Sequence, residues 1–341
     1  MDRYDEDDQR ILKKGRTQMK KKYRAARNVL IAGTGLILGT VGFIACGYPM
    51  MKEEAVSGVC GLPDVVTIMQ LGVKPDALAE TESTEAEEEL ESYAQQCELP
   101  YVATPVNYSM EEAILRIEEL SEEFPEMLEI AERQKEDKST YPYGLMKSLA
   151  NNPEMLDFVQ GYLQSDGSVT GGITEQEIEE EYPLFLQWDT RWGYYPYGKN
   201  GNIGTSGCGP TCLAMAIHYL TGETEATPDV IAAYSIEKGY YVADVGTAWA
   251  LLNEYPTLYG LTVSNPSLSE ENLKKHLDNG EVLICSVRPG DFTAGGHFIV
   301  IYGYEGDEFK INDPKCVYRS RRTWTYEEIK DDIKRTWAIA G

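Results

Sequence analysis

The longest uninterrupted apolar stretch of the chain lies near its N-terminus. Residues 28–50 contain no charged side chain, and the apolar core from Val29 to Cys46 is 18 residues long, about 27 Å as a helix and close to the hydrocarbon thickness of a bilayer. Nine Lys and Arg residues and no acidic residue lie between Arg10 and Arg27. Because positive charge marks the cytoplasmic side, we predict a transmembrane anchor at 28–50, with residues 1–27 as a basic cytoplasmic tail.

Other interpretations of this stretch stay open. A buried core helix is one, although the basic flank is unusual for it. The sequence FIAC at 43–46 loosely resembles a bacterial lipoprotein cleavage box, which would make Cys46 a lipidated N-terminus. A cleaved secretory signal is a further alternative. The anchor and both processed forms place residues 181–341 outside the cytoplasm.

Polar and acidic positions dominate the next segment, residues 51–106. Its centre, ETESTEAEEELE at 80–91, is low in complexity, and its like charges repel one another. We therefore expect a solvated acidic linker that builds no core.

A helical period begins after this linker. Ser109 and Glu112 have the spacing of a capping box, and apolar residues follow at Ile114, Ile117 and Leu120, as in an amphipathic helix. Further helices are predicted near 126–133 and 145–149 and after Asn152, which precedes Pro153. We call residues 107–165 the helical unit. Its expected role is packing or spacing, and whether it inhibits a neighbouring site stays open.

A Gly- and Ser-rich hinge is expected at 166–180, and the composition then changes to aromatic, glycine and β-branched residues. For 181–341 we predict an α+β domain: a helix after Cys208, short helices near 228–236 and 247–252, and antiparallel strands toward the C-terminus.

Charge and cysteine usage exclude several classes of function. The net charge of −25 would repel nucleic acid, so we expect no nucleic-acid partner. The seven cysteines form no CxxC pair and have no histidine at metal-ligand spacing, so we expect no metal and no other cofactor. If the region is extracellular, Cys60 and Cys97 are candidates for a disulfide.

One cysteine stands at the entrance of a predicted helix, in GTSGCGPTCLAMAIHYL at 204–220. Pro210 suits the first helical turn, so Cys208 lies at the helix N-terminus, where the dipole favours a thiolate. Apolar residues then recur with helical spacing, which predicts one buried face. We expect Gly207 and Gly209 to leave room for a substrate backbone, and Cys212 to be ordinary core.

Three histidines compete to be the base for this thiol. His218 lies on the same helix, roughly 15 Å along its axis, which is too far. His276 ends a predicted helix, where a cation is stabilised by the dipole. His297 follows two glycines and starts an apolar strand, and we expect it to be exposed to a cleft.

The predicted hairpin supplies a partner for His297. If the turn centres in YEGDE at 304–308, the position opposite His297 on the return strand is about 313 or 314. Residues directly opposite on antiparallel strands point to the same face. Asp313, in NDP, could therefore fix the histidine tautomer, whereas taken alone it is a turn initiator.

These motifs carry a family resemblance. GTSGCGPTCLAM, GGHFIV and INDP, with LQWDTRWG upstream, resemble the C39-like cysteine peptidases of bacteria, a papain-like group, over 181–341. The resemblance implies a papain-like fold, Cys208 as nucleophile, His297 as general base and acid, and Asp313 as orienting residue. Gln187 matches the oxyanion-hole glutamine, although it lies 21 positions before Cys208 and many relatives have it much closer. A structural role for Gln187 stays open, and the neighbouring Trp188 and Trp192 are expected in the core.

The expected function is a membrane-anchored, extracytoplasmic cysteine peptidase that cleaves a peptide or protein substrate. A papain-like amidase, endopeptidase or transpeptidase acting on cell-wall peptides would use the same residues. A catalytically silent, anchored binding module is the third alternative, and its expected sign is a lost nucleophile or base. The double-glycine specificity of transporter-fused relatives is not expected, because the chain has no ATP-binding motif.

Overall fold

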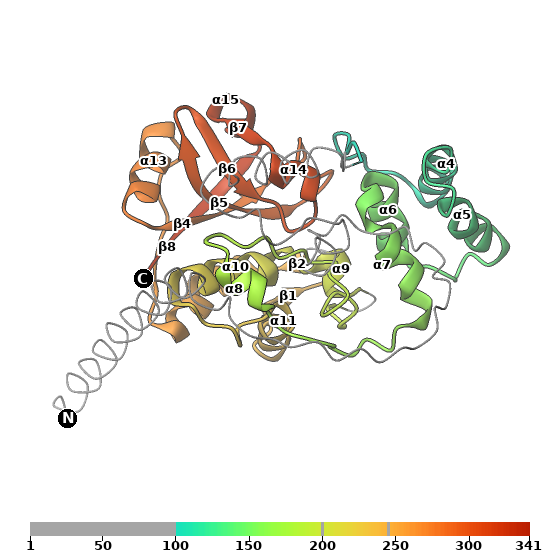
Figure 1. Ribbon diagram of the computed structural model, residues 1–341, viewed down its shortest axis with the longest axis horizontal. Helices are drawn as coiled ribbons and strands as arrows, with labels where there is room; N and C mark the ends of the chain where they lie inside the picture. The colour runs from blue at the N-terminus through green and yellow to red at the C-terminus, as the bar shows by residue number, and fades with distance from the viewer. Residues whose placement is uncertain (1–99, 199–200, 244–245) are drawn as a thin grey trace, which may run out of the picture. The chain divides into compact units, whose positions relative to one another are not determined.

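The computed structural model describes residues 100–198, 201–243 and 246–341 (Figure 1). The predicted anchor at 28–50, Cys46, the Cys60–Cys97 pair and most of the acidic linker lie outside these residues. Within the described ranges, no helix is long and apolar enough to cross a membrane.

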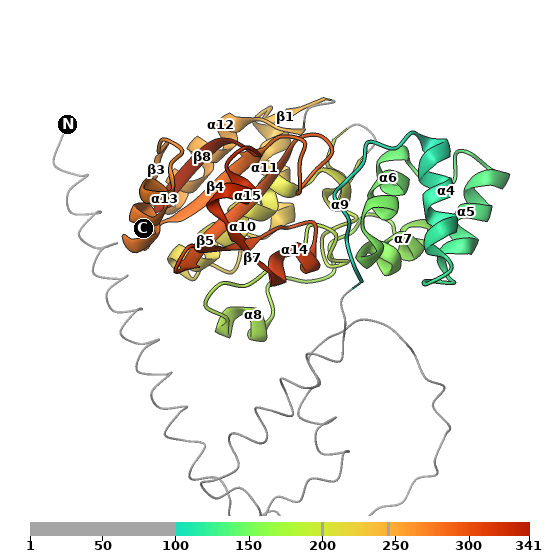
Figure 2. The ribbon, with the colours of Figure 1, turned by 90° about the horizontal axis from the view of Figure 1, so that it is seen from above.

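The helical unit contains the predicted helices: α4 (Met110–Leu120), α5 (Met127–Glu136), α6 (Tyr143–Asn151), η2 (Pro153–Met155), α7 (Leu156–Gly161) and η3 (Tyr162–Gln164). The capping box of Ser109 and Glu112 is present. Asn152 caps η2, as its place before Pro153 predicts. The apolar faces of these helices form a core of their own, in which Met127, Leu145 and Phe158 are fully or almost fully buried. Figure 2 shows the helices packed side by side.

The C-terminal part is built on a six-stranded sheet with the order β3-β8-β4-β5-β6-β7. Every neighbouring pair is antiparallel, so the prediction of an α+β fold with an antiparallel sheet is confirmed. The strands are β3 (Thr262–Ser264), β4 (Val282–Val287), β5 (His297–Glu305), β6 (Glu308–Asn312), β7 (Thr323–Thr325) and β8 (Ile333–Ala340). A separate two-stranded ribbon pairs β1 (Tyr241–Val242) with β2 (Gly246–Thr247).

Helices cover both faces of this sheet. On one face lie α10 (Cys208–Thr221), α11 (Pro228–Glu237), α12 (Trp249–Glu254) and η4 (Tyr255–Tyr259), which share a core with Ile284 and Val300. On the other face lies α13 (Glu270–Asp278), whose Leu273 joins the core of Leu283 and Ile299. Strand β4 is therefore buried at every position.

Helix α10 departs from the expectation of one buried face. All residues from Gly209 to His218 are buried, because the helix lies between the sheet and the neighbouring α11 and η4. The apolar residues that recur with helical spacing mark only part of the α10 surface, because this helix is buried on every side. The short helices α8 (Glu175–Glu179), α9 (Ile203–Ser206), α14 (Val317–Arg321) and α15 (Tyr326–Ile329) complete the described elements.

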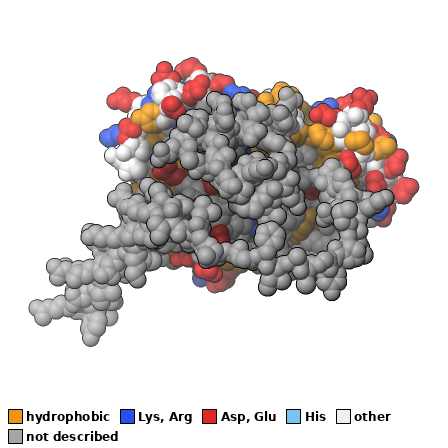
Figure 3. Space-filling model, in the orientation of Figure 1, with side chains coloured by type: hydrophobic (Ala, Val, Ile, Leu, Met, Phe, Trp, Pro, Cys, Tyr) orange, Lys and Arg blue, Asp and Glu red, His pale blue; other side chains and the backbone are white. Residues whose placement is uncertain are grey.

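Arg191 attaches the Gly- and Ser-rich stretch before α8 to the C-terminal part. The backbone O of Arg191 accepts from the N–H of Thr170 at 2.9 Å, and its Nη1 donates to the O of Gly172 at 2.8 Å. The Arg191 guanidinium also pairs with Glu177 at 2.7 Å. Acidic side chains are spread over the visible face of the described residues (Figure 3), as the net charge requires.

Candidate active site

Cys208 is the first residue of α10 and follows α9 directly, with Gly207 as the cap residue between the two helices. Its side chain is half-buried. The expectation that Gly207 and Gly209 leave room for a substrate is wrong. A Cβ at Gly207 would lie 2.4 Å from Cγ2 of Ile203, and one at Gly209 would lie 2.8 Å from three atoms of Thr247. At both glycines the space that a Cβ would need is taken by another side chain of the protein.

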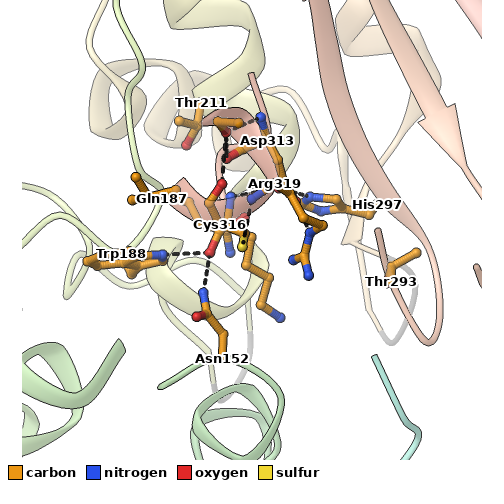
Figure 4. Close-up of polar contacts among 12 residues, drawn as sticks. Asn152, Gln187, Trp188, Thr211, Thr293, His297, Asp313, Cys316 and Arg319 are labelled. Atoms are coloured by element: carbon orange, nitrogen blue, oxygen red, sulfur yellow. Dashed lines mark hydrogen bonds and ion pairs between the residues drawn. The ribbon is translucent and has the colours of Figure 1, made fainter. Parts of the chain in front are cut away.

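His297 is the first residue of β5, where it pairs with Val287 of β4. Its Nε2 lies 2.7 Å from Oδ1 of Asp313 (Figure 4). The prediction that His297 is exposed is wrong: it is 5% exposed, and Asp313 is 0% exposed. The first five positions of β5 are all buried, so the histidine begins inside the packed sheet rather than at an open loop.

Asp313 contacts His297 from a position in the hairpin that differs from the predicted one. The turn is tighter than expected, with Gly306 at φ +60° between β5 and β6. A bulge between Ile301 and Gly303 then shifts the register, so that Val300 faces Asn312. Strand β6 ends at Asn312. Asp313 therefore contacts His297 from just beyond the strand end, not from the directly opposite ladder position.

The carboxylate of Asp313 has three donors. Oδ1 accepts from His297 and from the backbone N–H of Lys315 at 2.9 Å, and Oδ2 accepts from Nε of Arg319 at 2.7 Å. Burial alone would raise the pKa of Asp313, but the Arg319 and His297 charges hold it well below its usual range. These charges therefore favour the ionised form of Asp313.

Arg319 is the site residue that sequence reasoning missed. It lies in α14, is 4% exposed, and adds a second buried cation to the Asp313 carboxylate. The only signal was an arginine six positions after the aspartate, and nothing in the pattern gave its side-chain direction.

Cys208 and His297 shift each other's pKa toward an ion pair. With Nε2 engaged by Asp313, Nδ1 is the ring nitrogen left for the thiol. Burial would raise the pKa of Cys208, but the hydrogen bond and charge of His297 outweigh it and lower that pKa, with help from the Phe298 amide and the Lys315 charge. Burial would lower the pKa of His297, but Asp313 and Cys208 together raise it to about 9.

Cys212 provides the contrast within the same helix. It is fully buried in the core, as predicted, and burial raises its pKa well above the ordinary value. The two thiols, one helical turn apart, therefore have opposite electrostatic environments, and only Cys208 is favoured as a thiolate.

Gln187 connects α9, which precedes Cys208, with the residue that follows Asp313. Its Nε2 donates to the O of Gly204 in α9 at 2.7 Å, and its backbone N–H donates to the O of Pro314 at 2.7 Å. The side chain is 1% exposed, and its Oε1 has no hydrogen-bond partner among the described residues. Of the neighbouring tryptophans, Trp192 is core, as predicted. Trp188 is only partly buried, and its Nε1 donates to the O of Lys315 at 2.8 Å.

The other two histidines have structural partners. His218 is buried in α10, where its Nδ1 lies 3.0 Å from the O of Glu223. His276 lies in the last turn of α13, with Nδ1 2.8 Å from Oε2 of Glu281. In the described part of the chain, no three His, Cys, Asp or Glu side chains form a group that could hold a metal ion.

The C-terminal part of the chain matches a known protein family. Residues 179–341 match the model of the Peptidase C39-like family. The peptidase domain of Streptococcus ComA, a bifunctional ABC transporter of a quorum-sensing pathway, is 21% identical, with 47% of this chain and 98% of that chain covered and a TM-score of 0.32. A C39-like peptidase from Bacillus anthracis is 14% identical, with 50% and 98% covered and a TM-score of 0.36. No curated protein matches the chain.

Proposed function

Because residues 179–341 match the model of the Peptidase C39-like family, we propose that this protein is a cysteine peptidase that hydrolyses peptide bonds with Cys208, His297 and Asp313. The observation that carries the proposal is the buried contact of His297 with Asp313, at 2.7 Å, beside a thiol whose pKa is lowered. A catalytically silent binding module has no need for a cysteine with a lowered pKa beside a histidine with a raised pKa.

The proposed reaction is acyl transfer to the thiolate. The Cys208 sulfur attacks the peptide carbonyl carbon, and the His297 imidazolium gives its proton to the leaving amine as the C–N bond breaks. The resulting thioester is attacked by water, from which His297 takes a proton. The Cys208 thiolate then leaves and the carboxylic acid is released, which restores the starting ion pair. Asp313 keeps the ring oriented and stabilises its positive charge throughout.

The oxyanion of each tetrahedral intermediate needs preorganised donors. We assign this role to the backbone N–H of Cys208 and to Nε2 of Gln187. One of the two Nε2 protons is used by Gly204 O, which fixes the amide plane, and the second is left for the substrate. Such a donor commonly contributes about 2.7–4 kcal/mol to transition-state stabilisation.

We further propose that residues 28–50 anchor the chain in a membrane and that the peptidase domain acts outside the cytoplasm on a peptide or protein. The support is the uncharged 28–50 stretch and its basic flank. A membrane-impermeant thiol reagent added to intact cells should label Cys208. Labelling that requires cell lysis would contradict the location.

Thiol labelling of the full chain tests the enzyme proposal. Iodoacetamide is applied across pH, and the modified cysteines are mapped by mass spectrometry. Cys208 should react fast well below the ordinary thiol pKa of about 8.5, and His297→Ala should abolish that reactivity. Cys212 serves as the internal control. A Cys208 that reacts no faster than Cys212 would overturn the proposal.

A further inference from the structure

The helical unit forms hydrogen bonds with the chain segment that follows Asp313. Nδ2 of Asn152 donates to the O of Lys315 at 2.7 Å. The backbone N–H groups of Val317 and Tyr318 each donate to a different carboxylate oxygen of Glu154, both at 2.7 Å. Residues remote in sequence are thus joined by three hydrogen bonds at the edge of the candidate active site.

This segment carries two of the donors to the Asp313 carboxylate, which in turn contacts His297. Lys315 donates its N–H to Oδ1 of Asp313, and Arg319, inside α14, donates Nε to Oδ2. The first-turn N–H groups of a helix have no partner within it. Since Glu154 accepts two of them, a side chain of the helical unit helps to hold α14, and with it the Arg319 guanidinium, together with the Ser320 hydroxyl that contacts the Asp313 backbone.

Glu154 is itself held in place, and within the described ranges its carboxylate forms hydrogen bonds with no helix except α14. Its backbone N–H donates to Oδ1 of the buried Asn152 at 3.0 Å, and its Oε2 accepts from Nδ2 of Asn152 at 3.2 Å. Burial raises the pKa of Glu154 although the Tyr318 and Val317 amides lower it, so burying its charge costs free energy. Among the described residues, its carboxylate forms hydrogen bonds with Asn152 and with the segment after Asp313. A half-buried carboxylate of this kind contributes little to the core of the helical unit.

We propose that Glu154 is a positioning residue of the Cys208 site, and that the helical unit is a working part of the peptidase rather than a spacer. It fixes α14, through which Arg319 and Asp313 hold the His297 ring. This inference rests on the proposed peptidase function, which it extends from residues 179–341 to the helices before them.

Glu154→Gln in the full chain tests the inference. Gln keeps the size of the side chain but accepts with one oxygen only, so one α14 amide loses its acceptor. Networked positions of this kind shift coupled properties by about 2- to 30-fold, so alkylation of Cys208 by iodoacetamide at neutral pH should slow by that factor. The midpoint of its pH profile should also rise. The control Glu132→Gln, exposed on α5, should leave both unchanged.

Asn152→Asp is the second variant, and it decides the matter if Glu154→Gln does not fold. It keeps the Oδ1 acceptor for the Glu154 amide but loses the donor to Lys315, so it should also slow alkylation. Circular dichroism verifies that each variant is folded. A reactive wild-type Cys208 with an unchanged pH profile in the folded variants would overturn this inference alone. A wild-type Cys208 no more reactive than Cys212 would overturn the proposed function and this inference with it.

Discussion

Arg319 donates from Nε to Oδ2 of Asp313 at 2.7 Å, and both side chains are almost completely buried. The aspartate thereby divides its two oxygens between an arginine that is always charged and a histidine that changes charge. Because Arg319 already stabilises the carboxylate, Asp313 remains an acceptor whether His297 is neutral or protonated. Asp313 therefore provides a carboxylate acceptor behind the histidine at every stage of the proposed reaction.

Arg319→Met should destabilise the protein strongly. Removing one partner of a buried ion pair leaves an uncompensated charge and typically costs about 3–5 kcal/mol, and His297 only partly replaces the arginine. Urea denaturation measures the loss. Arg116→Met is the matched control: its pair with Glu119 on α4 is largely exposed, and such pairs contribute about 0–1 kcal/mol. Equal losses in the two variants would contradict a structural role for the buried pair.

Asp313→Asn should abolish most of the turnover while Cys208 stays in place. The amide can present an N–H where the carboxylate presents an acceptor, so His297 loses its tautomer and its charge stabilisation. In a related catalytic triad the same change costs about 10⁴-fold. Cleavage of a peptide substrate and Cys208 alkylation measure the loss, at a temperature where circular dichroism shows a folded protein.

The control for Asp313→Asn is Asp307→Asn in the same hairpin, where the side chain is 91% exposed. This variant should behave like the wild type. An Asp313→Asn protein that is folded and fully active would remove Asp313 from the proposed triad.

The local signals in the sequence predicted much of this molecule because they act over a few residues. The capping box at Ser109, the start of α10 at Cys208 and the buried Cys212 each depend on spacing within one or two turns. The contact of His297 with Asp313 was also expected, although the bulge in β5 gives it a different geometry.

The features of the site that could not be predicted from the sequence depend on tertiary packing. Whether Gly209 faces substrate or Thr247 is decided by strand β2, about forty positions further along the chain, which no periodicity encodes. The burial of His297 follows from the neighbouring strands, and the direction of Arg319 follows from the packing of α14 beside β6. Such long-range contacts leave no local pattern.

The pH dependence of kcat/KM should be bell-shaped. The pKa of Cys208 is lowered, so activity should rise at a pH below that of an ordinary thiol, near 8.5. The pKa of His297 is raised to about 9. Activity should therefore fall above that pH, because the imidazolium that protonates the leaving amine is lost while the thiolate remains.

Alkylation by iodoacetamide distinguishes the two limbs of this profile, because it needs the thiolate but not the proton donor. It should rise with the lower limb and stay high above pH 9, where peptide cleavage declines. Parallel decline of both rates at high pH would mean that the upper limb reports unfolding rather than His297.

Gly209→Ala should both destabilise the fold and disturb the nucleophile. The added Cβ would lie 2.8 Å from three side-chain atoms of Thr247, and the Thr247 hydroxyl is tied to the Tyr197 hydroxyl at 2.8 Å. The threonine cannot turn away without losing that hydrogen bond, so α10 must shift beside Cys208. Overpacking of this kind costs about 1–3 kcal/mol, measured by urea denaturation, and Cys208 alkylation should slow. Gly303→Ala, where a Cβ meets no atom within 4 Å, should change neither quantity, and a Gly209→Ala protein indistinguishable from it would show that the contact with Thr247 does not fix the start of α10.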